Sequence, residues 1–171
     1  DHQRRRAIVQ PAFHRKRIST YFDAMVEETS RTLEAWRPGT TVDAYAELRR
    51  TVLSIVLRCL FDGALGAHEP EFVDRMHLAL DYANRSPLQR IDKPWFGPYR
   101  KATKARAEMD AIVFDVIGKR RSEGERRDDI LGWLIEAQDD GRQLNDQEVR
   151  DQVISLIAAA YDTTSSVAGW I

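Results

Sequence analysis

The sequence predicts an all-α protein, on three observations. Glycine and proline are few, nine and six among 171 residues, and they gather in a small number of clusters. Between these clusters the apolar residues recur at intervals of three and four, the spacing of one face of an α-helix. The composition, 43% hydrophobic and 31% charged, is that of a globular protein with enough residues to bury a core. Any strands are therefore expected to be short.

Three helices are expected in the first third of the chain. The first covers about residues 2–12, and the second covers about residues 15–36 and ends before Pro38-Gly39. One face of the second helix is apolar and consists of Ile18, Phe22, Met25, Val26, Thr29 and Leu33. The third helix runs from near Asp43 to Gly63 and carries Cys59 on its apolar face.

Three more helices and one long loop follow. The fourth helix begins at Glu69-Pro70, where proline is tolerated in the first turn, and runs to about Arg85. The segment SPLQRIDKPWFGP at 86–98 contains three prolines and a glycine, so it is expected to be a loop. The fifth helix covers about 99–121, and a short sixth covers about 128–138.

The last helix starts after Asn145. This residue can act as the N-cap, and Glu148, three residues later, completes a capping box. If the helix continued to Ile171 it would be about 40 Å long, at 1.5 Å per residue. A helix of that length must cross the core of the domain.

An unusual segment, AAAYDTTSS at 158–166, lies near the middle of this expected helix. The three alanines leave a smooth face, against which a flat and bulky ligand can lie. The acid and four hydroxyl residues that follow are weak helix formers, and a threonine hydroxyl in a helix can bond back to a carbonyl one turn earlier. Local physics also permits another interpretation, in which the alanines only bring two helices together and Asp162 and Thr163 satisfy each other.

The order of residues in this segment resembles a known family. Ala159-Ala160-Tyr161-Asp162-Thr163-Thr164 is similar to the small-small-x-acid-Thr-Thr pattern in the central helix of cytochrome P450 monooxygenases, which crosses the distal face of the haem. At the other end of the chain, His2 and Arg6 are four residues apart and precede Pro11-Ala12-Phe13, as on an earlier helix of that family. Alone, His2 and Arg6 would be solvated surface residues. The resemblance covers essentially the whole chain, which is then part of a single cytochrome P450 domain.

The resemblance assigns roles to six residues. His2 and Arg6 would bind the two haem propionates through charge-assisted hydrogen bonds, and Ala159 and Ala160 would lie against the haem. Thr163 would hydrogen-bond bound oxygen or a nearby water, and Asp162 would relay protons from solvent. The sequence departs from the pattern at Ala160, where glycine is commoner, and after Arg6, where a second basic residue is usual.

The resemblance also implies two motifs that are absent from these 171 residues. In this family a cysteine thiolate in a glycine-containing loop holds the haem iron, downstream of the central helix, and a Glu-x-x-Arg motif lies between them. Neither is present, and Cys59 lies on an amphipathic helix, where core packing is its expected role. The chain is therefore interpreted as an internal fragment, inactive alone, without a metal ligand. Its parent protein would be a monooxygenase that takes electrons from NAD(P)H through a ferredoxin or reductase and oxidises a small hydrophobic organic substrate.

Charge and hydropathy limit the other partners. The formal net charge is −1 with mixed signs, so nucleic acid is not an expected partner. The longest apolar run, VISLIAAAY at 153–161, has about half of the roughly 18 residues that a membrane span needs. Association with a membrane is therefore not expected, and the expected location is the cytoplasm. Two alternatives remain open on the residues alone. One is a non-enzymatic all-α ligand-binding or dimerisation domain, and the other is a haem-free helical scaffold for other proteins.

Overall fold

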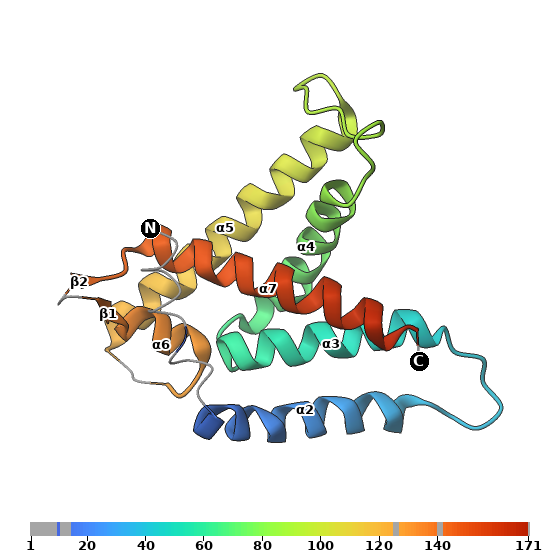
Figure 1. Cartoon of the computed structure of the whole chain (residues 1–171), viewed down its shortest axis with the longest axis horizontal. Coiled ribbons are helices and arrows are strands. Elements are labelled where there is room, and N and C mark those ends of the chain that lie inside the picture. The colour runs from blue at the N-terminus through green and yellow to red at the C-terminus, as the bar shows by residue number, and fades with distance from the viewer. Residues whose placement is uncertain (1–9, 11–14, 125–126, 140–141, 171) are drawn as a thin grey trace. The chain divides into compact units, whose positions relative to one another are not determined.

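The computed structural model describes residues 10, 15–124, 127–139 and 142–170, and it confirms the all-α prediction (Figure 1). The chain divides into two compact units. One consists of Asp1–Gly63 and Glu125–Ile171, and the other of Ala64–Gly124. The helix expected at 2–12 lies outside the described residues, apart from residue 10.

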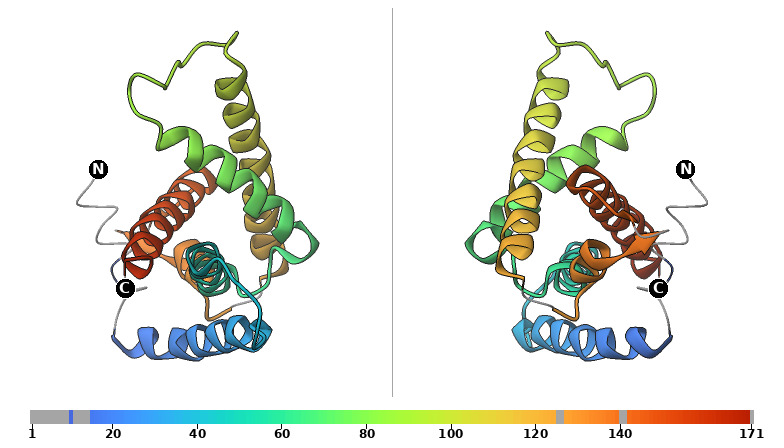
Figure 2. Two further views of the ribbon diagram at one scale, coloured as in Figure 1. Left: turned by 90° about the vertical axis from the view of Figure 1, so that its right-hand side faces the viewer. Right: turned by 90° about the vertical axis from the view of Figure 1, so that its left-hand side faces the viewer.

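In the first unit, one helix packs against two others. Its elements are α2 (Arg15–Ala35), α3 (Ala44–Phe61), α6 (Ile130–Glu136), β1 (Gln138–Asp139), β2 (Arg142–Gln143) and α7 (Asp146–Ala168). Helix α3 contacts α2 on one side and α7 on another, an arrangement visible in all three views (Figures 1 and 2). The two strands pair antiparallel with Gln138 opposite Gln143, and they are short, as expected. The core of this unit therefore forms around α3.

Helix α3 begins and ends where its sequence predicts. The Asp43 carboxylate accepts a hydrogen bond from the Ala46 N–H at 3.0 Å, which caps the first turn. At the other end, Asp62 and Gly63 have positive φ angles of 44° and 77°. A left-handed residue directs the chain out of the helix, and glycine adopts that conformation without strain. These two signals fix the length of the helix on which α2 and α7 pack.

The apolar face of helix α2, which the sequence predicts, is largely exposed. The side chains on this face are between 40% and 62% exposed, namely Ile18, Phe22, Met25, Val26 and Leu33, whereas Tyr21 of the same helix is buried at 8%. Polar side chains of α2 contact α3 instead. Arg58 of α3 donates to the buried Glu28 carboxylate at 2.9 Å, and the hydroxyls of Thr32 and Thr51 lie 2.8 Å apart. Periodicity identifies the residues that share a face, but it does not determine what that face packs against.

The second unit is a helical hairpin. It contains η2 (Gly66–His68), α4 (Glu69–Ala83) and α5 (Gly97–Glu123), joined by the loop 84–96. Helices α4 and α5 pack side by side (Figure 2). The core between them consists of apolar side chains at most 8% exposed, including Phe72, Met76, Ala79, Tyr82, Met109, Val113 and Ile117. The expected loop is confirmed, although α5 starts at Gly97 with Pro98 in its first turn.

Candidate functional site

Helix α7 carries the unusual segment, and its start agrees with the prediction. The Asn145 side chain accepts from the Glu148 N–H at 2.9 Å, and the Glu148 carboxylate accepts from the Asn145 N–H at 3.0 Å. This reciprocal pair is the predicted capping box. The helix is 23 residues long and ends at Ala168, so segment 158–166 lies in its C-terminal half rather than at its middle.

One face of α7 is buried in the first unit. Every fourth residue on that face is at most 2% exposed: Val149, Val153, Ile157, Tyr161 and Ser165. Residues four apart lie above one another on a helix, so these five form one stripe along the side of α7. Helix α3 is the main partner of α7 within this unit. Packing of this stripe fixes which residues of the helix point away from the core.

Tyr161 fixes this rotation most strongly. Its side chain is fully buried, and its Oη accepts a hydrogen bond from Nε of Arg49, on α3, at 2.9 Å. The Arg49 guanidinium carbon also lies 5.3 Å from the centroid of the Tyr161 ring. A charged donor to a buried phenol is stronger than a neutral hydrogen bond. The pair therefore holds α7 to α3 immediately before Asp162.

Ala159 and Thr163 lie away from this buried stripe, unlike Ser165. Ala159 and Thr163 are exposed, and Ala160 is half-buried. Ala159 is two residues from Tyr161, so the two side chains point in nearly opposite directions at 100° per residue. Ser155, Ala159, Thr163 and Ser166 are all exposed, and none of them is bulky. A flat ring fits against such a face, because no long side chain holds it away from the helix backbone.

Two hydroxyl groups of the segment, those of Thr163 and Ser165, bond back to their own helix. Thr163 Oγ1 donates to the Ala159 carbonyl at 2.5 Å, and Ser165 Oγ donates to the Tyr161 carbonyl at 2.6 Å. The helix nevertheless continues without interruption to Ala168. The weak helix formers are therefore accommodated by local bonds. The proton of the Thr163 hydroxyl points to a backbone carbonyl, which leaves its oxygen lone pairs for an external donor.

The structure brings together four of the six predicted site residues. Ala159, Ala160, Asp162 and Thr163 all lie on α7, with Asp162 half-buried beside the exposed Thr163. His2 and Arg6, which were predicted to bind the haem propionates, lie outside the described residues. Sequence reasoning missed the Arg49–Tyr161 pair. The four-residue spacing of Val149, Val153, Ile157 and Tyr161 could have placed the tyrosine in the core, but nothing local indicates Arg49.

Cys59 is buried, as predicted, and burial favours the protonated form of its thiol. It is 9% exposed, and burial raises the pKa of the thiol from 9.0 to about 11. The thiolate, which is the form that binds metals, is therefore scarcer at neutral pH than for an ordinary cysteine. Among the described residues, no three His, Cys, Asp or Glu side chains gather into a metal site.

A cavity of about 200 Å³ lies next to Cys59 in the first unit, and it does not suit a haem. Five carboxylates line it, those of Asp23, Glu27, Asp62, Asp128 and Asp129, with Arg58 as the one basic residue of the lining. Pockets for drug-sized ligands are about 300–1,000 Å³ and mostly apolar. Carboxylates would also repel the haem propionates. The open face of α7 is thus the better candidate site.

The family model for cytochrome P450 matches residues 1–171. Pentalenene oxygenase of Streptomyces avermitilis is 32% identical over 181 residues, which are 100% of this chain and 39% of that protein. Cytochrome P450 139 of Mycobacterium tuberculosis is 32% identical over 176 residues, 99% of this chain and 40% of that protein. Cyclooctat-9-en-7-ol 5-monooxygenase of Streptomyces melanosporofaciens is 28% identical over 179 residues, which are 100% of this chain and 39% of that protein. The chain spans about 40% of the length of these curated relatives.

Solved structures superpose on most of the chain. The retinoic acid-bound cyanobacterial CYP120A1 superposes with a TM-score of 0.83 at 26% identity, over 96% of this chain and 37% of that one. The haem domain of cytochrome P450DA gives a TM-score of 0.77 at 25% identity, over 92% of this chain and 36% of that one. No helix in the described part of this chain is long and apolar enough to cross a bilayer.

Proposed function

The chain belongs to the cytochrome P450 family, and we propose that its parent protein is a haem-dependent monooxygenase that oxidises a small hydrophobic organic substrate. The observation that carries the proposal is the exposed face of α7, where Ala159 leaves space for a flat ring and Thr163 follows one turn later. Two relatives support the substrate class, since the compounds in their names, pentalenene and cyclooctat-9-en-7-ol, are an alkene and an alkenol.

The residues of this chain fit a haem on that face. Ala159 and Ala160 would lie against the ring, because methyl groups allow close approach to the helix. His2 and Arg6 would hold the propionates, as a donor and a cation suited to carboxylates. When bound, the haem supplies the electron chemistry that activates dioxygen, and the protein provides position and protons.

The Thr163 hydroxyl would form a hydrogen bond with a water or ligand at the site. Its hydroxyl proton is directed to the Ala159 carbonyl at 2.5 Å, so the oxygen can accept a hydrogen bond from a water or ligand on the exposed face. To donate outward, the hydroxyl must first release that carbonyl. The side chain can therefore change between acceptor and donor by rotation, while the helix keeps its backbone bonds.

Asp162 would connect this position to solvent. It is half-buried and adjacent to Thr163, and the Arg49–Tyr161 pair beside it fixes the turn on which it lies. A carboxylate at the edge of a site can take up a proton from water and release it inward. Asp162 thus acts as the proton relay, and Thr164 has only a supporting role.

The remaining parts of the enzyme would come from outside residues 1–171. The thiolate that holds the iron is expected from a downstream cysteine, because Cys59 is buried and its raised pKa keeps the thiol protonated. Electrons would come from NAD(P)H through a ferredoxin or a reductase. Residues 1–171 alone are expected to be inactive, and the parent is expected in the cytoplasm.

The complete parent protein should be red when purified. Its reduced complex with carbon monoxide should show the red-shifted absorption band of a thiolate-ligated haem. The measurement is an absorption spectrum before and after addition of dithionite and carbon monoxide. A colourless parent that takes up no haem on reconstitution would contradict the proposal and favour a helical ligand-binding domain.

Replacing Thr163 with alanine in the parent should uncouple electron consumption from product. We expect product per NAD(P)H to fall, with the rate of product formation reduced by about 10²-fold, the lower range for loss of a positioned proton-transfer group. Hydrogen peroxide release should rise to balance the electrons. The matched control is Thr164→Ala, which removes an exposed hydroxyl one residue away and should change coupling little. Unchanged coupling without extra peroxide in Thr163→Ala would exclude the assigned role.

A further inference from the structure

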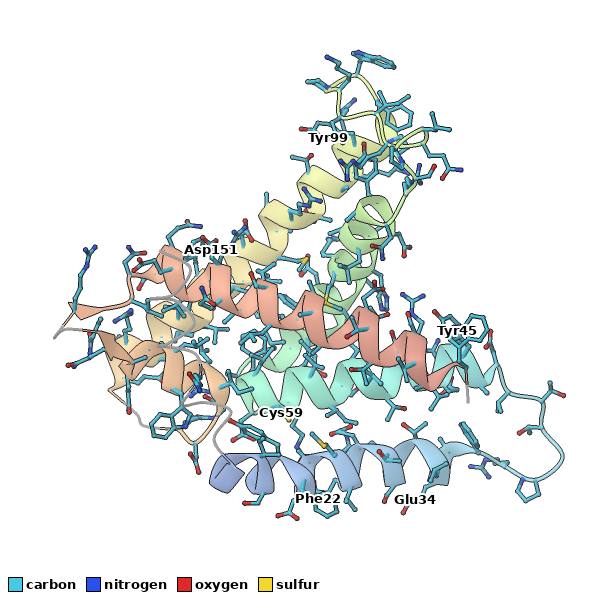
Figure 3. All side chains as sticks on the ribbon, viewed as in Figure 1. Phe22, Glu34, Tyr45, Cys59, Tyr99 and Asp151 are labelled. Carbon is cyan, nitrogen blue, oxygen red and sulfur yellow. The ribbon has the colours of Figure 1, made fainter. Side chains whose placement is uncertain are left out.

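The start of α3 and the end of α7 meet at Tyr45 and Gly169. Tyr45 lies in the first turn of α3, beside the C-terminal end of α7 (Figure 3). A Cβ atom added at Gly169 would lie 2.7 Å from Cε2 of the Tyr45 ring. Carbon atoms in contact are normally about 3.5–4.0 Å apart, so in this arrangement only glycine leaves room for the ring. The ring therefore rests directly on the backbone at the end of α7.

Arg49 joins this contact to Tyr161. Tyr45 and Arg49 are four residues apart on α3, so their side chains are neighbours on one face of that helix. The guanidinium carbon of Arg49 lies 5.6 Å from the centroid of the Tyr45 ring and 5.3 Å from that of the Tyr161 ring. Both distances are within the range of about 6 Å at which a cation is attracted to an aromatic ring. Together with the hydrogen bond from Arg49 Nε to Tyr161 Oη, these contacts form one cluster, Tyr45–Arg49–Tyr161.

The cluster fastens α7 at two points, Tyr161 and Gly169, which flank the acid and the four hydroxyl residues. In this stretch the Ser165 hydroxyl donates to the Tyr161 carbonyl at 2.6 Å and also approaches the Asp162 carbonyl at 3.3 Å. Such bonds compete with the backbone N–H groups of the helix, and they often bend it. The helix nevertheless continues to Ala168. Contacts with α3 at both points oppose bending of the stretch between them.

We infer that Arg49, braced by Tyr45, is a positioning residue for the turn of α7 that carries Asp162 and Thr163. This role rests on the proposed monooxygenase function, in which that turn takes up and directs protons. Arg49 acts through Tyr161 and the backbone of α7. A displacement of about 1 Å at a reacting site can remove most of a reaction rate. The cluster therefore sets how much of the NAD(P)H consumed yields product and how much reduces dioxygen to hydrogen peroxide.

Replacing Arg49 with methionine in the complete parent tests this role. We expect product formation to slow by about tenfold and peroxide to rise, with the haem content unchanged, because the Thr163 hydroxyl is present but displaced. Arg49→Lys should restore part of the coupling, since an ammonium group can still donate to Tyr161 and is attracted to both rings. The matched control is Arg50→Met. Arg50 is exposed and its Nη1 donates to Glu47 at 2.7 Å, so this variant should couple normally.

A double-mutant cycle with Thr163→Ala separates positioning from a general loss of stability. Adding Arg49→Met to Thr163→Ala should lower the rate of product formation no further, because the hydroxyl that Arg49 positions is already gone. A purely structural role would instead multiply the two losses. Tyr161→Phe removes the acceptor of the same hydrogen bond and keeps the ring. It should uncouple as Arg49→Met does, and it decides the question if Arg49→Met does not fold.

The outcomes distinguish this role from the proposed function. If Thr163→Ala uncouples while Arg49→Met and Tyr161→Phe couple normally, Arg49 does not position the turn and the proposed function stands. Multiplied losses in the double-mutant cycle would also overturn the positioning role. If Thr163→Ala itself couples normally, the proposed function of the turn is wrong, and the role of Arg49 is lost with it.

Discussion

Replacing Tyr161 with alanine should destabilise the parent protein by about 3–5 kcal/mol, the usual loss when a buried aromatic side chain is truncated. The ring is fully buried on the stripe that joins α7 to α3, and its removal leaves a cavity between these helices. The variant also loses the acceptor of the Arg49 hydrogen bond, made at 2.9 Å. The measurement is the midpoint of urea unfolding, followed by circular dichroism.

The control for this prediction is Tyr161→Phe. It keeps the ring and removes only the hydroxyl, so the loss should be about 1–3 kcal/mol, the range for a hydrogen bond from a charged donor. If alanine and phenylalanine destabilise equally, packing of the ring contributes little and the Arg49 bond alone holds α7. If alanine is tolerated with no change in the midpoint, α7 does not pack on α3 through Tyr161.

Replacing Gly132 with alanine should destabilise the protein by about 3 kcal/mol, because α6 has no room for a side chain at this position. A Cβ atom there would lie 2.5 Å from the backbone carbonyl oxygen of Arg127 and 3.1 Å from a carboxylate oxygen of Asp129. Asp129 is the N-cap of α6, and its carboxylate accepts from the Gly132 N–H at 2.7 Å. The clash therefore also disturbs the bond that starts the helix. The midpoint of urea unfolding again measures the effect.

Gly118→Ala is the matched control for this substitution. Gly118 lies in α5 and is exposed, and a Cβ atom added there would have no neighbouring atom within 4 Å. Alanine in a helix interior is more favourable than glycine by about 1 kcal/mol, so this variant should be slightly stabilised. Opposite signs for the two glycines would confirm that crowding at Gly132, rather than helix propensity, decides the result. Stabilisation by both substitutions would contradict the close approach at α6.

Most helix boundaries could be predicted from local sequence, because caps and breakers act within a few residues. The Asn145–Glu148 capping box and the proline-containing loop before α5 are both found where they were expected. The face of α7 that carries Ala159 and Thr163 also follows from spacing along one helix. The roles of these residues, and of His2 and Arg6, remain proposals that rest on the family.

Other features depend on contacts between segments distant in sequence, and local patterns do not report them. The five apolar residues of α2 share a face, as their spacing predicts, yet that face is exposed and Glu28 and Thr32 contact α3 instead. Arg49 binds Tyr161 across 112 residues of sequence. Helical periodicity determines which side chains lie together on one element. Which element they meet is decided by the free energy of the whole assembled chain, so only the tertiary structure reveals it.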